Sequence, residues 1–236
     1  MCSGRRARTA DGGELFIPLH DKVALKYIRR ASATVALIVM TTAIHAAITS
    51  GLFGASERID LGLGLIPSVL FGKAVIGPDI SHVPAWVTPL TSIFIHGSFW
   101  HLAGNLLFLW VLGDNVEDAM GSFAFAAFYL LSGIGAGLTF AIINPASQSP
   151  LIGASGAVSG VAAAYLLLYP RARIVGLLFN LVPVSLSAGM VIGVWIGYQI
   201  LSALLTIDPH VGWWAHVGGI VSGILLLASF KRREVP

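Results

Sequence analysis

The sequence has few cysteines and few charges, and both scarcities narrow its class. Its one cysteine, Cys2, permits neither an internal disulfide nor a cysteine-based metal cluster. Charged residues make up only 11% of the 236 residues, whereas 56% are hydrophobic, and the mean hydropathy is +0.84. Water-soluble globular domains do not normally reach such a composition. The chain is therefore predicted to be an all-α, polytopic membrane protein.

Six apolar runs approach the roughly 20 residues that a helix needs to cross a bilayer. They predict transmembrane helices over about 33–53, 99–113, 122–143, 153–169, 186–205 and 214–230. The segment 174–184, interrupted by Asn180 and Pro183, is the weakest boundary and can extend the fifth span. The sequence contains no internal repeat. These runs predict a six-helix membrane domain over 33–230, flanked by tails at 1–32 and 231–236.

The longest connection, residues 54–98, is apolar but is broken by four prolines, and we expect it to lie in the membrane interface. Basic residues set the orientation of the spans. If the N-terminus is cytoplasmic, 12 of the 14 Lys and Arg residues fall on the cytoplasmic side, and only Arg58 and Lys73 do not. Both termini are then cytoplasmic. The slight basic excess reflects this topology, so we expect lipid and no nucleic acid as a partner.

Few strongly polar side chains remain at membrane depth, and each is a functional candidate. They are His45, His96, His101, Asn105, Ser155, Ser159 and His216. Because spans two, four and six all start on the outer side, His101, Asn105, Ser155 and His216 lie within roughly 10 Å of the outer end of the hydrocarbon layer. This common depth predicts a site.

A serine beside a histidine is the minimal pair for nucleophilic catalysis, because the imidazole takes the hydroxyl proton and later returns it to the leaving group. Ser155 is the candidate nucleophile and His216 the candidate base. No carboxylate is placed to orient the histidine, so a dyad is expected. Asn105 and His101, four residues apart on one helical face, are the candidate oxyanion donors together with the backbone N–H of Ser155. His96 is expected to be a structural hydrogen-bonding residue of the first loop.

Small residues recur every four positions in two of these spans. They are Gly156, Gly160 and Ala164 in the fourth, and Ala215, Gly219 and Gly223 in the sixth. Such stripes let helix backbones approach closely in lipid, which would bring the serine hydroxyl towards the imidazole ring. Gly153 and Gly156 also leave the backbone around Ser155 open to a substrate carbonyl.

Three motifs together resemble the rhomboid intramembrane serine proteases. They are "HGSFWHLAGN" in the second span, "GASG" in the fourth and "AHVGGIVSG" in the sixth. The resemblance covers residues 33–230 and implies Ser155 as nucleophile, His216 as base, and His101, Asn105 and the Ser155 backbone as the oxyanion site. It also implies a membrane-dipping first loop. Ala119 stands where some members carry arginine near the Glu117 position, and Ser159 where some carry an aromatic residue.

The resulting hypothesis is a serine endopeptidase that cuts membrane-anchored proteins near the outer face of a prokaryotic cytoplasmic membrane, without metal or cofactor. A non-catalytic relative that binds membrane helices is the main alternative. A zinc site from His96, His101 and His216 is disfavoured by the i, i+5 spacing of the first two. A transporter would spread its polar groups over the full membrane depth. Helix packing is the alternative for Ser155, and the expected role of Ser159 and His45.

Overall fold

The computed structural model describes residues 16–52, 54–179, 181–208 and 211–232. Part of the predicted N-terminal tail and most of the C-terminal tail lie outside this range. So do Cys2, Asn180 and four of the basic residues counted for the orientation of the spans, which are Arg5, Arg6, Arg8 and Arg233.

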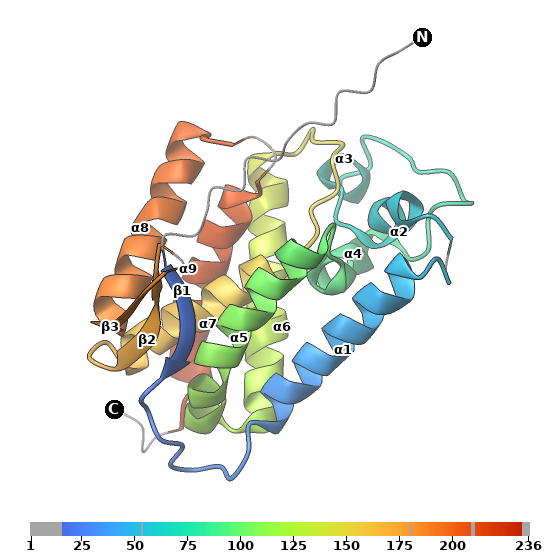
Figure 1. Cartoon of the computed structure of the whole chain (residues 1–236). Coiled ribbons are helices and arrows are strands. Elements are labelled where there is room, and N and C mark those ends of the chain that lie inside the picture. The colour runs from blue at the N-terminus through green and yellow to red at the C-terminus, as the bar shows by residue number, and fades with distance from the viewer. Residues whose placement is uncertain (1–15, 53, 180, 209–210, 233–236) are drawn as a thin grey trace.

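Six long helices follow the six predicted spans in order. They are α1 (Ser32–Thr49), α5 (Phe99–Met120), α6 (Ser122–Ile143), α7 (Ser155–Leu168), α8 (Ala188–Leu205) and α9 (Trp213–Phe230). Figure 1 shows them as one bundle, with α7 inside it and α1 and α8 at opposite sides. The prediction of a mainly helical membrane domain is confirmed.

These helices differ in their ability to span a bilayer by length and composition. Four qualify alone: α1, α6, α8 and α9. A fifth span arises if Ala85–Phe94 and Phe99–Met120, which are bent by 80° relative to each other, are taken together. The remaining apolar helix, α7, has only 14 residues. At 1.5 Å per residue it covers about 21 Å, which is roughly 9 Å less than the hydrocarbon layer.

The short helix α7 is also the most enclosed of the six. All its residues from Gly156 to Tyr165 are buried. Because α7 is surrounded by other helices, it does not need to match the thickness of the lipid. Its first residue, Ser155, precedes this enclosed stretch and is itself half-buried.

Short helices fill the connection between α1 and α5, all on one side of the bundle (Figure 1). They are α2 (Ser56–Leu63), α3 (Pro67–Leu70), the 3₁₀ turns Ala85–Val87 and Ser92–Phe94, and α4 (Thr88–Thr91). Leu65 pairs with Leu151 through two backbone hydrogen bonds, which ties this connection to the segment before α7. Val75 and Trp86 are 94% and 76% exposed. Such exposed apolar side chains suit the interfacial position predicted for this loop.

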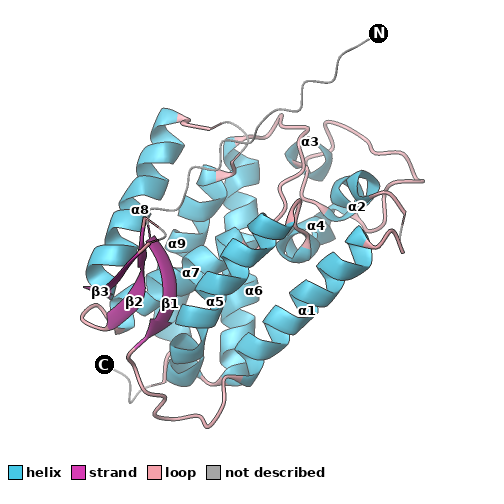
Figure 2. Cartoon of the chain, in the orientation of Figure 1, coloured by secondary structure: helices cyan, strands magenta, loops and turns pink. Residues whose placement is uncertain are grey.

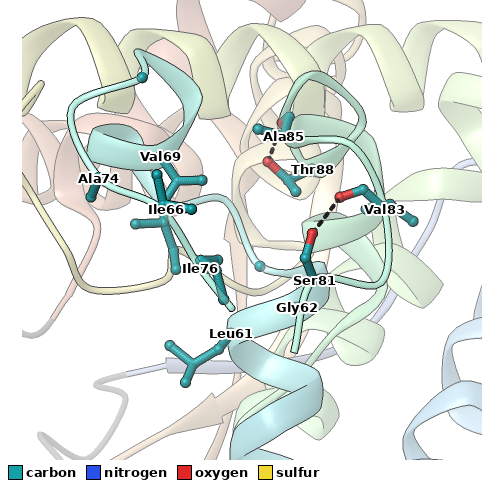
Figure 3. A pocket seen from close by; sticks show the side chains of 13 residues that line it. Leu61, Gly62, Ile66, Val69, Ala74, Ile76, Ser81, Val83, Ala85 and Thr88 are labelled. Carbon is teal, nitrogen blue, oxygen red and sulfur yellow. Dashed lines mark hydrogen bonds between the residues drawn. The ribbon is translucent and has the colours of Figure 1, made fainter. Parts of the chain in front are cut away.

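A cavity of about 310 Å³ lies within this connection (Figure 3). Most of its lining is apolar and includes Leu61, Ile66, Val69, Ile76 and Val83. Its polar lining atoms are engaged locally, since the Ser81 hydroxyl donates to the Val83 carbonyl and the Thr88 hydroxyl to the Ala85 carbonyl. None of the predicted site residues lines this cavity.

The structure also contains a three-stranded antiparallel sheet (Figure 2), which the sequence analysis did not predict. Its order is β1 (Phe16–Asp21), β2 (Arg173–Leu178), β3 (Val182–Ser187). The β2–β3 hairpin joins α7 to α8, so the alternative in which 174–184 extends the fifth span is wrong. The run is apolar because β2 is half-buried on the bundle, with Ile174 fully enclosed. An apolar run of this length is ambiguous between strand and helix.

Two carboxylates, those of Asp118 and Asp21, bind the N-terminal segment before α1 to the bundle. Asp118 accepts hydrogen bonds from the backbone N–H groups of Lys26, Tyr27 and Ile28 at 2.7–2.8 Å. At the end of β1, Asp21 accepts from the Tyr165 hydroxyl and from Asn115 Nδ2. Residues 16–31 therefore pack on the helices.

Glu117 is fully buried and caps the start of α1. Its carboxylate accepts from the backbone N–H groups of Ala33 and Thr34 and from the hydroxyls of Thr34 and Ser122, at 2.5–3.0 Å. The first N–H groups of a helix lack partners within the helix, and a carboxylate there is stabilised by the helix dipole. Hydroxyl and N–H groups thus supply the hydrogen bonds of the Glu117 carboxylate. Position 119, where some rhomboid sequences carry arginine, is alanine here.

Candidate functional site

The structure brings Ser155 and His216 into direct contact. Ser155 is the first residue of α7, and His216 lies in the first turn of α9. The Ser155 Oγ is 2.8 Å from His216 Nε2, which is hydrogen-bond distance. Two groups separated by 61 residues thus form a pair at the N-terminal ends of two neighbouring helices.

Glycines make this approach possible because the α7 and α9 backbones touch. A Cβ added at Gly219 would lie 2.0 Å from the Gly156 carbonyl oxygen, and one at Gly223 would lie 2.5 Å from that of Gly160. Real Cβ atoms do not approach other atoms so closely. The two small-residue stripes therefore face each other, and Ser155 and His216 lie next to the contact between Gly156 and Gly219.

The other ring nitrogen of His216 has a partner that the sequence analysis missed. His216 Nδ1 lies 2.8 Å from Oε1 of Gln199, a residue of α8 that is only 4% exposed. One signal was available, since Gln199 is the only amide or charged side chain in the fifth predicted span, and such groups are rare and functional at membrane depth. The partner is an amide oxygen and not a carboxylate.

A pair of aromatic rings, one from α9 and one from α8, lies beside the histidine. The Trp213 ring meets the His216 ring edge to face, with centroids 5.8 Å apart, and Tyr198 of α8 meets Trp213 in the same way at 5.7 Å. Ser159, where some related sequences carry an aromatic residue, donates instead to the Ser155 carbonyl at 2.6 Å. Its hydroxyl is thus engaged within α7.

The candidate oxyanion side chains, Asn105 and His101, lie in the first two turns of α5. Asn105 is 7% exposed, and its Nδ2 donates one hydrogen to the His101 carbonyl at 2.9 Å. An amide nitrogen carries two hydrogens, so the second is left for a ligand. The His101 ring packs against Gly153, where a Cβ would lie 2.7 Å from both its Cε1 and Nε2. Only glycine fits at this position, which also has a φ of +121°.

The backbone at the start of α7 offers further donors. Within the described segments, no hydrogen bond engages the N–H of Ser155 or Gly156, whereas the preceding N–H groups are both occupied. That of Gly153 donates to the Ser92 carbonyl at 2.9 Å, and that of Ala154 to His96 Nε2 at 3.3 Å. The Ala154 bond shows that His96 holds the loop that precedes Ser155. The two unpaired N–H groups at the start of α7 attract negative charge.

A second, small space borders Ser155. It measures about 10 Å³, and glycine and alanine form most of its walls, among them Gly137, Gly153, Ala136 and Ala215. A volume of this order holds about one water molecule. The walls stay close because none of these residues carries more than a methyl group.

The remaining histidine candidates, His45, His96 and His101, do not form a metal site with His216. His45 is buried in α1. The His96 and His101 rings touch edge to face, 5.1 Å between centroids. Over the described ranges, no three His, Cys, Asp or Glu side chains are arranged to hold a metal ion.

Comparison with known proteins identifies the family. A model of the Rhomboid domain matches residues 84–233. Rhomboid protein 1, mitochondrial, of Saccharomyces cerevisiae is 31% identical over 61% of this chain and 42% of its own length. Rhomboid protease GluP of Bacillus subtilis is 31% identical over 61% of this chain and 26% of its own. Rhomboid protease AarA of Providencia stuartii is 37% identical over 41% and 38%, respectively.

The chain therefore spans less than half the length of each of these relatives. Its apolar helices and its relatives together make it an integral, multi-pass membrane protein. The resemblance drawn from its three motifs is confirmed, because the match extends over well over half of the sequence: the chain belongs to the rhomboid family.

Proposed function

We propose that this protein is an intramembrane serine endopeptidase that hydrolyses peptide bonds of membrane-anchored proteins. The observation that carries the proposal is the 2.8 Å contact between Ser155 Oγ and His216 Nε2. Two of its relatives are named rhomboid proteases. A histidine within hydrogen-bond reach is what a serine needs to become a nucleophile at neutral pH.

In the first half of the reaction, Ser155 Oγ attacks the substrate carbonyl carbon as its proton passes to His216 Nε2. The carbonyl oxygen becomes an oxyanion. When the intermediate collapses, the C–N bond breaks and His216 gives the proton to the departing amine. In the second half, water attacks the acyl ester, His216 takes the proton of that water, and the ester bond breaks with return of the proton to Ser155.

We propose that donors from α5 and from the start of α7 stabilise the oxyanion. They are the free N–H groups at the start of α7, the second hydrogen of Asn105 Nδ2, and the His101 ring. Donors fixed in place before the reaction cost no reorganisation when charge develops on the oxygen.

Water for the second half comes from the outer side. The small space beside Ser155 is of the size of one water molecule and gives water a position next to the acyl ester. The positive-inside rule supports an outer position for this site, because twelve of the fourteen basic residues then lie on the cytoplasmic side with the termini. The membrane proposed is the prokaryotic cytoplasmic membrane.

The substrate must present an extended backbone. An intact transmembrane helix uses its carbonyls and N–H groups internally, so the cleaved segment carries small or helix-weakening residues near the outer end of its span.

The test is cleavage in proteoliposomes of single-pass peptides that carry Gly, Ala or Ser near the outer end of the span. The wild-type protein should cleave them, and Ser155→Ala and His216→Ala should each abolish the product while retaining the wild-type melting temperature. A fluorophosphonate probe should label the wild type and not Ser155→Ala. Cleavage that persists in either variant rejects the assignment. Capture of the peptides without cleavage or labelling by the wild type would favour a helix-binding relative.

A further inference from the structure

We infer that Gln199 is a third member of the site, a positioning residue that holds His216 in the protonation form required of a base. The inference rests on the proposed function for its role in turnover, and on the geometry of the two side chains for the contact itself. The contact joins Gln199 Oε1 to His216 Nδ1 at 2.8 Å.

Gln199 is directed inward by its place on α8. The buried residues of this helix are Ala188, Ile192, Gln199, Ser202 and Ala203, which follow one face at helical spacing. The rest of α8 is apolar and largely exposed, as a lipid-facing helix would be. An amide buried among apolar groups is costly unless it is hydrogen-bonded. His216 supplies that bond. Gln199 is the only long polar side chain among the buried residues of α8.

The direction of the hydrogen bond determines the tautomer. A neutral imidazole has one N–H and one bare nitrogen. The Gln199 oxygen can only accept, so it selects the form with the hydrogen on Nδ1 and leaves Nε2 bare. A bare Nε2 is the nitrogen that must accept the proton of Ser155. The opposite tautomer would present an N–H to the serine and could not act as its base.

The bond also fixes the ring plane. Nδ1 is held by Gln199 of α8, and the ring edge by Trp213 of α9, so Nε2 is aimed at Ser155 from two sides. The three residues in contact with the His216 ring come from three helices: Ser155 from α7, Gln199 from α8 and Trp213 from α9. The orientation of the base therefore depends on the position of α8, a peripheral helix.

Three substitutions at this position separate an acceptor from a space filler. Gln199→Leu keeps the volume and removes the acceptor. Gln199→Glu keeps an acceptor oxygen at the same reach but brings a charge. Gln199→Asn keeps the amide and shortens its reach by one methylene. A residue that only packs should tolerate leucine best and glutamate worst, because a buried charge is the costliest of the three.

If Gln199 positions His216, the order is reversed. Gln199→Leu and Gln199→Asn should lower kcat by about tenfold, the loss of roughly one hydrogen bond, with KM changed by less than about twofold. Gln199→Glu should restore kcat to within about threefold of wild type, since a carboxylate is a stronger acceptor for the Nδ1 hydrogen. Ser202→Ala is the matched control. It removes a polar group from the same buried face, one turn away, where the Ser202 hydroxyl has no hydrogen bond within the described residues. It should leave kcat unchanged.

The second readout needs no activity. Nitrogen-15 NMR of the full-length protein in lipid, with the His216 signals identified by their loss in His216→Ala, should show the hydrogen on Nδ1 in the wild type. Gln199→Leu should show a mixture of the two tautomers.

Either a Gln199→Leu enzyme with wild-type kcat, or a Gln199→Glu enzyme slower than Gln199→Leu, overturns the inference. A wild-type His216 with its hydrogen on Nε2 does so as well. These results are distinct from failure of the proposed function, which would appear as absence of Ser155-dependent cleavage in the wild type. In that case the NMR measurement alone still decides whether Gln199 sets the tautomer.

Discussion

The contact between α7 and α9 predicts that a single added methyl group separates the reacting atoms. At Gly219, one helical turn beyond His216, a Cβ would lie 2.0 Å from the Gly156 carbonyl oxygen, whereas ordinary contacts begin at 3.4 Å. The obstacle is backbone, which cannot rotate away, so the helices must move apart by about 1.4 Å locally. The 2.8 Å between Ser155 and His216 would then become about 4 Å, beyond hydrogen-bond range.

Gly219→Ala should therefore lower kcat by about 100-fold, the cost of misplacing catalytic groups by about 1 Å. The assay is single-turnover cleavage of a transmembrane peptide in proteoliposomes, with melting temperature measured in parallel. Gly193→Ala is the matched control, because its Cβ would meet nothing within 4 Å. Gly223→Ala, whose Cβ would lie 2.5 Å from the Gly160 carbonyl one turn further down, should lower the melting temperature with less effect on kcat. Full activity in Gly219→Ala would refute the argument from contact.

Three further outcomes are expected. Asn105→Ala should lower kcat by up to about 10²–10³-fold with KM nearly unchanged, since one oxyanion donor is lost; steady-state kinetics on the same peptide measure both constants. Glu117→Ala should destabilise the protein by about 3 kcal/mol, because the N–H groups of Ala33 and Thr34 lose a charged acceptor; denaturation in detergent micelles measures the loss. Burial raises the pKa of the Asp21 carboxyl above its usual range. The native state then gains stability from protonation at low pH and loses it as pH rises through that raised pKa. The melting temperature of Asp21→Asn minus that of wild type should accordingly grow from pH 4 to pH 7, and thermal scans across this range test it.

The helices were predictable because each must be long and apolar in a membrane. The run predicted over 122–143 coincides with α6, Ser122–Ile143. Prediction overran where an apolar run continues beyond the helix, as at residues 50–52 after α1, and fell short where polar residues belong to the helix, as at Asp114 to Met120 in α5. The pairing of Ser155 with His216 could be anticipated because glycine stripes report which helices can touch.

The sheet and the role of Gln199 could not be read from local patterns. The partners of β1 lie more than 150 residues away, and neither strand has a period that separates it from a helix over so few residues. Gln199 was identifiable as a polar residue within a span, but its partner depends on the rotation of α8 about its axis. The buried hydrogen bonds of Glu117 likewise depend on where α1 begins relative to α5.

The sheet has a consequence for the order of assembly during synthesis. Phe16 to Asp21 leave the ribosome before all six long helices, yet their hydrogen-bonding neighbours begin only at Arg173, after four of these helices have been made. Until then β1 has no edge to join. A shortened chain that starts at the first helix would complete its bundle with one side of β2 bare and with the Tyr165 hydroxyl deprived of Asp21. A version of this protein that keeps these contacts must therefore start upstream of its first membrane helix.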